Sequence, residues 1–299
     1  MPFINLAGYQ FTPLENLLPL QEELKSLCLQ LEMKGTILLA EEGINFFVAG
    51  TRKASDNLMA RLREIRGLAN LKAKESESQE QPFRRMFVKI KKEIISFGIE
   101  GINPALAPSP KIAPKVLKEW LDAGKPITLL DTRNDYEIKM GTFRGAIPPR
   151  INHFRDFPEA VKKLPEQLKE EPVVMFCTGG IRCEKAGPFM EREGFKKIFQ
   201  LEGGILDYFK ECGGAHYDGE CFVFDRRVGV DAALQETSSE MCFACQMPLT
   251  FEDQRHPHYE IEKSCPHCFG REKKEKIPKP RKSRKLKKEL HERSSISSL

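Results

Sequence analysis

The residues of this chain best suited to chemistry lie in one short segment, Cys177–Cys183, which reads Cys-Thr-Gly-Gly-Ile-Arg-Cys. The segment follows the apolar run Val173–Phe176 and precedes a helix-compatible stretch that starts at Glu184. A cysteine between a buried strand and a helix start lies near free backbone amides and the positive end of the helix dipole. Because such surroundings lower a thiol pKa from its free value of about 8.5, we expect Cys177 to be a catalytic thiolate that reagents can reach. The alternative is an inert thiol at the end of a buried strand.

The loop that follows this cysteine is suited to holding an anion. It consists of Thr178, Gly179, Gly180, Ile181 and Arg182. Its glycines allow positive φ angles, so its amides can turn inward around the sulfur, and its arginine adds a fixed positive charge. Two interpretations remain open for Cys183, which ends the segment. It could resolve an oxidised Cys177 by forming a disulfide, or it could simply pack in the first helical turn.

A second cysteine pattern lies near the C-terminus. It comprises two C-x-x-C pairs separated by nineteen residues, Cys242 with Cys245 and Cys265 with Cys268. Four thiolates brought together in this way favour a structural Zn²⁺ ion, and a closed four-thiolate shell leaves no position for a substrate. A redox disulfide pair, reduced free thiols and an iron centre are the alternatives.

The elements around Cys177 must place it at the edge of a sheet. Strands are expected at 127–131, 173–177 and 197–201. Helical patterns are expected at 113–123, 157–170 and 184–193. This alternation predicts a parallel α/β sheet, in which active sites lie at the carboxyl ends of the strands.

Four segments in this region resemble the rhodanese fold, over roughly residues 112–212. They are Leu129–Arg133, Glu137–Ala146, the Cys177 loop, and Gly194–Gly204. The loop from Cys177 to Arg182 spans six residues, as in sulfurtransferase-type rhodaneses, whereas the related phosphatases use a longer loop. We expect Asp131 and Arg133 to form an ion pair or helix cap that supports the loop.

The N-terminal third predicts an α+β module. Strands are expected at 3–11, 35–39, 45–48, 87–90 and 93–97. Helices are expected at 14–31 and 54–65. This order is ferredoxin-like with an extra edge strand. A polar loop is expected at 75–82.

Longer strings narrow the resemblance to one family. Phe176–Ala186, with Leu39–Asn45 upstream and Phe222–Arg227 downstream, looks like the tRNA uridine(34) hydroxylase family, over residues 1 to about 270. The resemblance implies an acylphosphatase-like first domain and O2-dependent 5-hydroxylation of the wobble uridine in the anticodon loop of tRNA. No electron donor is indicated, because the chain contains no G-x-G-x-x-G fingerprint. A persulfide sulfurtransferase and a non-catalytic RNA- or protein-binding adaptor are the alternatives.

The whole pattern predicts five regions. They are an α+β domain at 1–100, a Pro-rich linker at 101–114, a rhodanese domain at 115–215, a Cys-rich module at 216–270 and a disordered basic tail at 271–299. Between the first and third regions we expect a cleft wide enough for an extruded base.

The distribution of charge and of apolar residues indicates the binding partners and the cellular location to expect. Residues 271–293 contain twelve Lys or Arg and four Glu, a local net charge of +8, whereas the whole chain carries only +5. We expect this tail to assist tRNA binding through phosphate contacts, although it could equally be a solubility tail. No apolar run is long enough to span a membrane, and the start lacks the features of a signal peptide. A cytoplasmic enzyme without a membrane or DNA partner is therefore expected.

Overall fold

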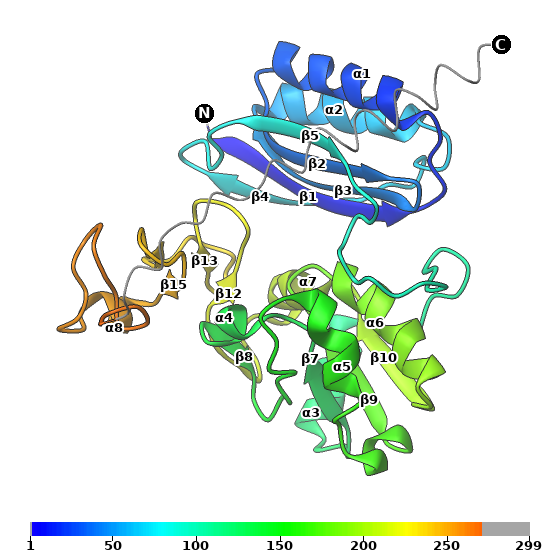
Figure 1. Cartoon of the computed structure of the whole chain (residues 1–299), viewed down its shortest axis with the longest axis vertical. Coiled ribbons are helices and arrows are strands. Elements are labelled where there is room, and N and C mark those ends of the chain that lie inside the picture. Colours follow the sequence, from blue (N-terminus) through cyan, green and yellow to red (C-terminus); the bar gives the residue numbers. More distant parts are fainter. Residues whose placement is uncertain (1, 271–299) are drawn as a thin grey trace.

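The computed structural model describes residues 2–270 of the chain (Figure 1). An N-terminal module, residues 3–90, lies against a parallel-sheet module, residues 111–212, and a C-terminal segment, residues 213–270, extends to one side. The predicted basic tail, 271–299, falls outside the described residues. No helix in residues 2–270 is long and apolar enough to cross a membrane.

The N-terminal module is a five-stranded sheet with two helices. Its elements are β1 (Phe3–Phe11), α1 (Leu17–Gln30), β2 (Lys34–Ala40), β3 (Gly43–Gly50), α2 (Arg52–Glu64), β4 (Ala73–Ser78) and β5 (Met86–Ile90). The strand order is β4-β1-β3-β2-β5, with β5 parallel to β2 at one edge. The first four strands and both helices form the predicted kind of unit, a ferredoxin-like β-α-β-β-α-β arrangement, but β4 closes it and the strand expected at 87–90 is the extra edge strand, β5.

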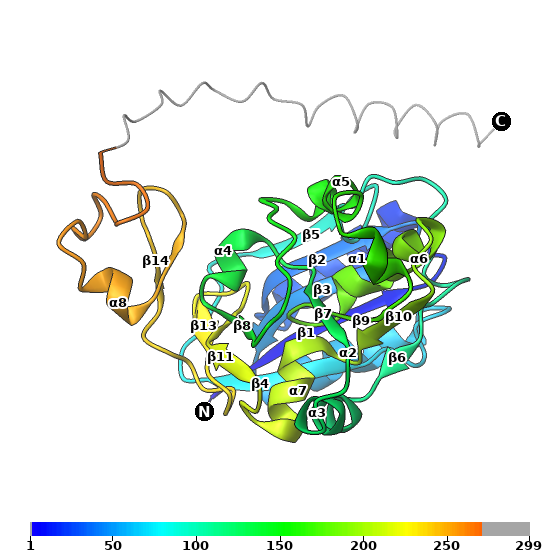
Figure 2. The same ribbon diagram turned by 90° about the horizontal axis from the view of Figure 1, so that it is seen from below.

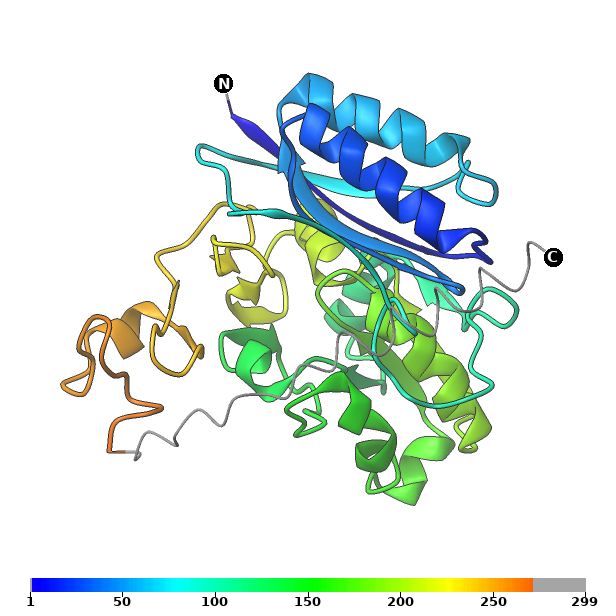
Figure 3. The ribbon, with the colours of Figure 1, turned by 45° about the horizontal axis from the view of Figure 1, so that its top comes forward.

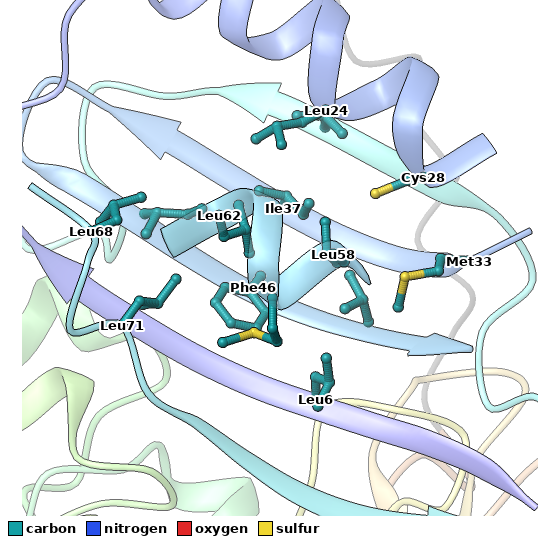
Figure 4. Close-up of a cluster of buried hydrophobic side chains, with 14 of the residues drawn as sticks. Leu6, Leu24, Cys28, Met33, Ile37, Phe46, Leu58, Leu62, Leu68 and Leu71 are labelled. Carbon is teal, nitrogen blue, oxygen red and sulfur yellow. The ribbon is translucent and has the colours of Figure 1, made fainter. Parts of the chain in front are cut away.

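The two faces of this sheet have different roles. Side chains alternate along a strand, so Leu6, Ile37 and Phe46 point toward α1 and α2 and form the core (Figure 4). Tyr9 and Phe47, at positions of the opposite parity, belong to the other face. Because both helices cover the first face, the second is left toward the parallel-sheet module (Figure 3).

Two sequence predictions in this module are wrong. Part of the expected polar loop is a strand, β4, which pairs with β1 alone; an edge strand can carry alternating polar side chains because one of its sides faces solvent. The expected strand at 93–97 does not form. Instead, the Glu93 carboxylate accepts hydrogen bonds from the backbone amides of Phe97 and Gly98. The Phe97 side chain packs into the core of the parallel-sheet module.

The parallel-sheet module contains four parallel strands in the order β6-β10-β9-β7. Its elements are β6 (Lys111–Ile112), α3 (Pro114–Asp122), β7 (Thr128–Asp131), α4 (Asp135–Ile138), β8 (Gly141–Phe143), α5 (Phe157–Val161), β9 (Pro172–Phe176), α6 (Ile181–Arg192), β10 (Lys197–Leu201) and α7 (Gly204–Cys212). Helices cover both faces, as the alternation of strands and helices predicts. Strand β6 lies inside the expected Pro-rich linker.

Alternation along β9 sends its side chains into two cores. Val173 and Met175 pack on the face covered by α5 and α6, whereas Val174 and Phe176 pack on the face covered by α3 and α7. By the same parity Cys177 belongs to the α6 side. The expected helix at 157–170 is split into α5 and a 3₁₀ turn at Glu166–Lys169, and α6 starts at Ile181 rather than Glu184.

The C-terminal segment contains only short elements. They are β11 (Tyr217–Gly219), β12 (Cys221–Phe222), β13 (Gly229–Val230), β14 (Glu240–Met241), β15 (Pro248–Leu249) and α8 (Phe251–Gln254). Strand β11 pairs with β8, which fixes the start of the segment to the parallel-sheet module. The part that carries β14 and α8 lies apart from both sheets (Figure 2).

Candidate active site

Cys177 lies at the carboxyl end of β9, where the chain turns into α6. Its sulfur accepts a hydrogen bond from the Gly180 amide at 3.1 Å. Gly180 has a φ of 100°, a left-handed conformation that favours glycine and turns this amide inward. Two amides from the start of α7 hold the loop from outside, Ile205 donating to the Cys177 carbonyl and Leu206 to the Thr178 carbonyl. The predicted loop geometry is therefore present.

The surroundings of Cys177 favour its thiolate. Burial opposes ionisation, but a hydrogen bond from the Cys183 thiol, the charge of Arg182 and the amides of Arg182 and Gly180 outweigh it and lower the pKa of Cys177 to about 5. Burial and the neighbouring thiolate raise the pKa of Cys183 well above its usual range. The two cysteines thus form a thiolate and thiol pair at neutral pH.

Access to the sulfur differs from the prediction. The Cys177 side chain has 0% of its surface exposed, so the thiolate is not open to solvent in this conformation. The cover comes partly from the other module. A Cβ atom at Gly180 would lie 2.9 Å from the Tyr9 hydroxyl of β1, so the N-terminal sheet packs directly on the loop.

Arg182 is held by a carboxylate that the sequence analysis did not single out. Its NH1 and NH2 groups donate to the two oxygens of Glu137 at 2.6 and 2.8 Å, and both side chains are buried. The guanidinium is therefore oriented by Glu137 and acts on Cys177 mainly through its charge. The only sign of this role in the sequence is the position of Glu137, which is the first residue of the rhodanese-like segment Glu137–Ala146.

Asp131 and Arg133 form the predicted supporting ion pair. They are fully buried and 2.7 Å apart, and the Arg133 amide also donates to Asp131. Thr142 donates to Asp131, and Arg133 donates to the carbonyl of Gly141. These bonds tie β7 to β8 beneath the loop, so the pair shapes the site without entering it.

Several polar contacts join the two modules around the site. Lys185 of α6 is 2% exposed and pairs with Glu42 at 2.9 Å and Glu93 at 2.7 Å. The Tyr9 hydroxyl donates to Glu184 at 3.0 Å. The motif Leu39–Asn45 therefore does more than make a hairpin turn, because its Glu42 binds the helix that follows the Cys177 loop.

A cavity of about 1430 Å³ lies between the modules. The second face of the N-terminal sheet borders it on one side, with Tyr9 and Phe47, and the loop from Cys177 to Arg182 borders it on the other. Six exposed basic side chains also line it: Lys72, Lys91, Lys92, Lys111, Arg155 and Lys210. The cavity is thus an open, partly apolar space with a basic rim, large enough for a nucleotide.

The structure also brings together the four C-terminal cysteines. Their sulfur atoms lie within 4.8 Å of one another, with separations of 3.6, 3.7 and 3.9 Å for three of the pairs. A tetrahedral zinc ion with Zn–S bonds of about 2.3 Å would space its sulfurs about 3.8 Å apart. Cys242, Cys245, Cys265 and Cys268 can therefore hold a metal ion and fit zinc. None of them lines the cavity.

A thiolate in a six-residue loop between a parallel strand and a helix defines a rhodanese-like domain, and residues 113–211 match the family model described as "Rhodanese-like domain". Residues 3–94 match the model "UPF0176 acylphosphatase like domain". A chain that contains both domains belongs to a narrower class of proteins than a chain that contains only one of them.

Full-length relatives identify the family. A Cupriavidus taiwanensis protein named tRNA uridine(34) hydroxylase is 46% identical over 90% of this chain and 98% of its own length. A Burkholderia cenocepacia protein of the same name is 47% identical, with 90% and 98% covered. The chain belongs to the tRNA uridine(34) hydroxylase family. The solution structure of a rhodanese-like domain from Anabaena is 25% identical, covering 37% of this chain and 80% of that one with a TM-score of 0.31.

Proposed function

We propose that this protein hydroxylates C5 of the wobble uridine, U34, of tRNA, with O2 as the source of oxygen. The observation that carries this proposal is the near-complete alignment with proteins named for that uridine, which spans both modules and the C-terminal segment. The thiolate beside a cavity between the modules is consistent with it, because residues of both modules and of the start of the C-terminal segment line this cavity.

The basic rim supports an RNA substrate. Phosphates of an anticodon loop would meet exposed lysine and arginine side chains on both modules, among them Lys72 and Arg155. Bases of a single-stranded loop can be turned out of their stack at modest cost, so U34 can enter the cavity. The +8 charge of the sequence 271–293 adds a second attraction that does not depend on base sequence.

We assign Cys177 the role of reactive thiolate, with the amides of the loop Thr178–Arg182 holding its negative charge. Cys183 is the resolving thiol. Hydroxylation inserts one atom of O2 and reduces the other to water, which consumes two electrons and two protons. Oxidation of the two thiols to a disulfide releases that number, so uridine, O2 and two thiols give hydroxyuridine, water and one disulfide. An external thiol reductant then restores the pair.

We assign the four C-terminal cysteines a structural Zn²⁺ ion. A closed four-thiolate shell offers no open position, and the cluster does not border the cavity. The ion would stabilise residues 240–270, which have few apolar contacts of their own, and would take no part in the reaction with O2.

A persulfide sulfurtransferase is the second candidate. It is favoured by the six-residue loop and by the inward amide that meets the Cys177 sulfur. Under this alternative Cys177 would carry a sulfane sulfur to a small acceptor, a carrier protein or tRNA.

Nucleoside analysis separates the candidates. Cells that lack the gene would receive the wild type, Cys177→Ser, or Cys212→Ser as a matched control outside the site, and their tRNA would be digested for mass spectrometry under ¹⁸O2. We expect ¹⁸O-labelled 5-hydroxyuridine derivatives with the wild type and Cys212→Ser, and none with Cys177→Ser. Loss of thiolated bases in place of hydroxylated ones would favour the sulfurtransferase. Unchanged hydroxylation in Cys177→Ser would overturn the proposal.

A further inference from the structure

One aromatic side chain that lines the cavity is exposed. Phe224 lies in the turn between β12 and β13 and is 44% exposed. Among the exposed large hydrophobic side chains in residues 2–270, Phe224 alone lines the cavity. An apolar ring exposed in a cavity beside the proposed reactive thiolate is typical of a ligand-binding surface.

The ring of Phe224 is held from several sides. Phe222 meets it edge-on, with ring centroids 5.0 Å apart, and Phe47 of the N-terminal sheet lies 6.1 Å away at 48°. The guanidinium carbon of Arg182 is 5.8 Å from the ring centroid. Because Arg182 is itself fixed by Glu137, the position of the ring is linked to the Cys177 loop.

A second contact fixes the same turn to the loop. The Thr178 hydroxyl donates to the carbonyl of Phe222 at 3.4 Å, and Arg227 on the far side of the turn donates to Ser76 of β4 at 2.8 Å. The turn therefore spans from the reactive loop to the N-terminal sheet. It presents a flat ring to the cavity at a defined place.

We infer that Phe224 is the platform on which the target base stacks, with Phe47 as the second aromatic wall. This inference rests on the proposed function and adds a positioning residue to it. A base that leaves the anticodon stack loses its neighbours, and an aromatic ring replaces that contact. Stacking on Phe224 would keep the pyrimidine beside Arg182 and the Cys177 loop, while the other cavity walls contact the flanking nucleotides.

The test compares purified variants in a tRNA hydroxylation assay. Phe224→Leu keeps an apolar side chain but removes the flat ring, and we expect kcat/KM to fall roughly tenfold to a hundredfold, the range that loss of one base–aromatic stack gives. Phe224→Trp should retain activity within about threefold, because it restores a flat surface. Phe87→Leu is the matched control, since Phe87 is 42% exposed and lies outside the cavity.

The readouts distinguish a platform from a structural role. Phe224→Leu should change the melting temperature and the alkylation rate of Cys177 little, because leucine keeps an apolar side chain against Phe222 and Phe47. Activity of Phe224→Leu within twofold of the wild type would overturn the inference, as would an equal loss in Phe224→Trp or a fall in Cys177 alkylation. A wild type without hydroxylase activity would instead overturn the proposed function.

Discussion

The loop around Cys177 and the cluster of four C-terminal cysteines use the same side chain in opposite ways. In the loop, one sulfur is surrounded by backbone amides, a thiol and an arginine charge, all supplied by rigid elements. In the cluster, four sulfurs are surrounded chiefly by one another, on short strands and turns. The proposed reactivity of Cys177 thus depends on what the fold places around its thiol, whereas the proposed metal binding depends on the thiols that the fold places together.

The largest effect is expected from removing the Zn²⁺ ion proposed at the four C-terminal cysteines, which tests whether the two regions are independent. Cys265→Ser, or a strong chelator, should abolish binding of one zinc per chain and loosen residues 240–270, because structural zinc contributes about 10–16 kcal/mol in comparable small domains. The alkylation rate of Cys177 should not change. Elemental analysis and limited proteolysis measure the first effects, with Cys212→Ser as control. Iron in place of zinc would contradict the assignment of the metal, and a change in the alkylation rate of Cys177 would show that the two regions are not independent.

A smaller effect is expected from disturbing the support of the loop. Glu137→Gln keeps the shape of the side chain but leaves the buried Arg182 charge unpaired, which should lower the free energy of unfolding by about 3–5 kcal/mol. Urea denaturation measures this change. Glu159→Gln, in the exposed pair with Lys162, should have little effect. A Glu137→Gln variant as stable as the control would mean that the buried pair does not hold the loop.

The smallest effect concerns the thiol pair itself. Cys183→Ala removes a hydrogen-bond donor from the Cys177 thiolate, so the pKa of Cys177 should rise from its value of about 5. The pH profile of Cys177 alkylation, followed by mass spectrometry, should shift upward by about one pH unit. Cys28→Ala, in the N-terminal core, should leave the profile unchanged. An unshifted profile in Cys183→Ala would assign the low pKa to Arg182 and the amides alone.

This pKa also has a consequence for stability. The folded value for Cys177 lies below the value of about 8.5 in an unfolded chain, so its ionisation stabilises the fold above that pH. That contribution declines as the pH falls through the interval between the two values, and it is lost below about 5. Replacing Cys177 by Ser should therefore flatten the dependence of unfolding free energy on pH in this window.

Local patterns in the sequence predicted much of this molecule. Cysteine spacing identified both the loop and the four-cysteine cluster, and the alternation of apolar strands and helices predicted the parallel sheet. The order of elements in the N-terminal third predicted its ferredoxin-like unit. These features depend on residues close together in the chain, which is why periodicity and spacing revealed them.

The remaining features depend on contacts between distant residues. Strand β4 was missed because a polar edge strand lacks the apolar alternation that marks a half-buried one. Tyr9 and Phe224 were not assigned a role because their partners in the site lie on other elements, Tyr9 with Glu184 and Phe224 with Phe47. The contact of Tyr9 with Gly180 comes from the docking of one module on the other, which no local pattern encodes.

Because the two modules are docked, residue 180 must satisfy two separate conditions, one on its backbone conformation and one on the size of its side chain. An alanine there would need a left-handed backbone conformation, which costs an L-residue about 1 kcal/mol or more, and its methyl group would also press on a tyrosine hydroxyl from a different module. A rhodanese-like domain on its own faces only the first demand. In this chain, therefore, the range of substitutions that residue 180 tolerates is limited by a strand that lies some 170 residues earlier in the sequence.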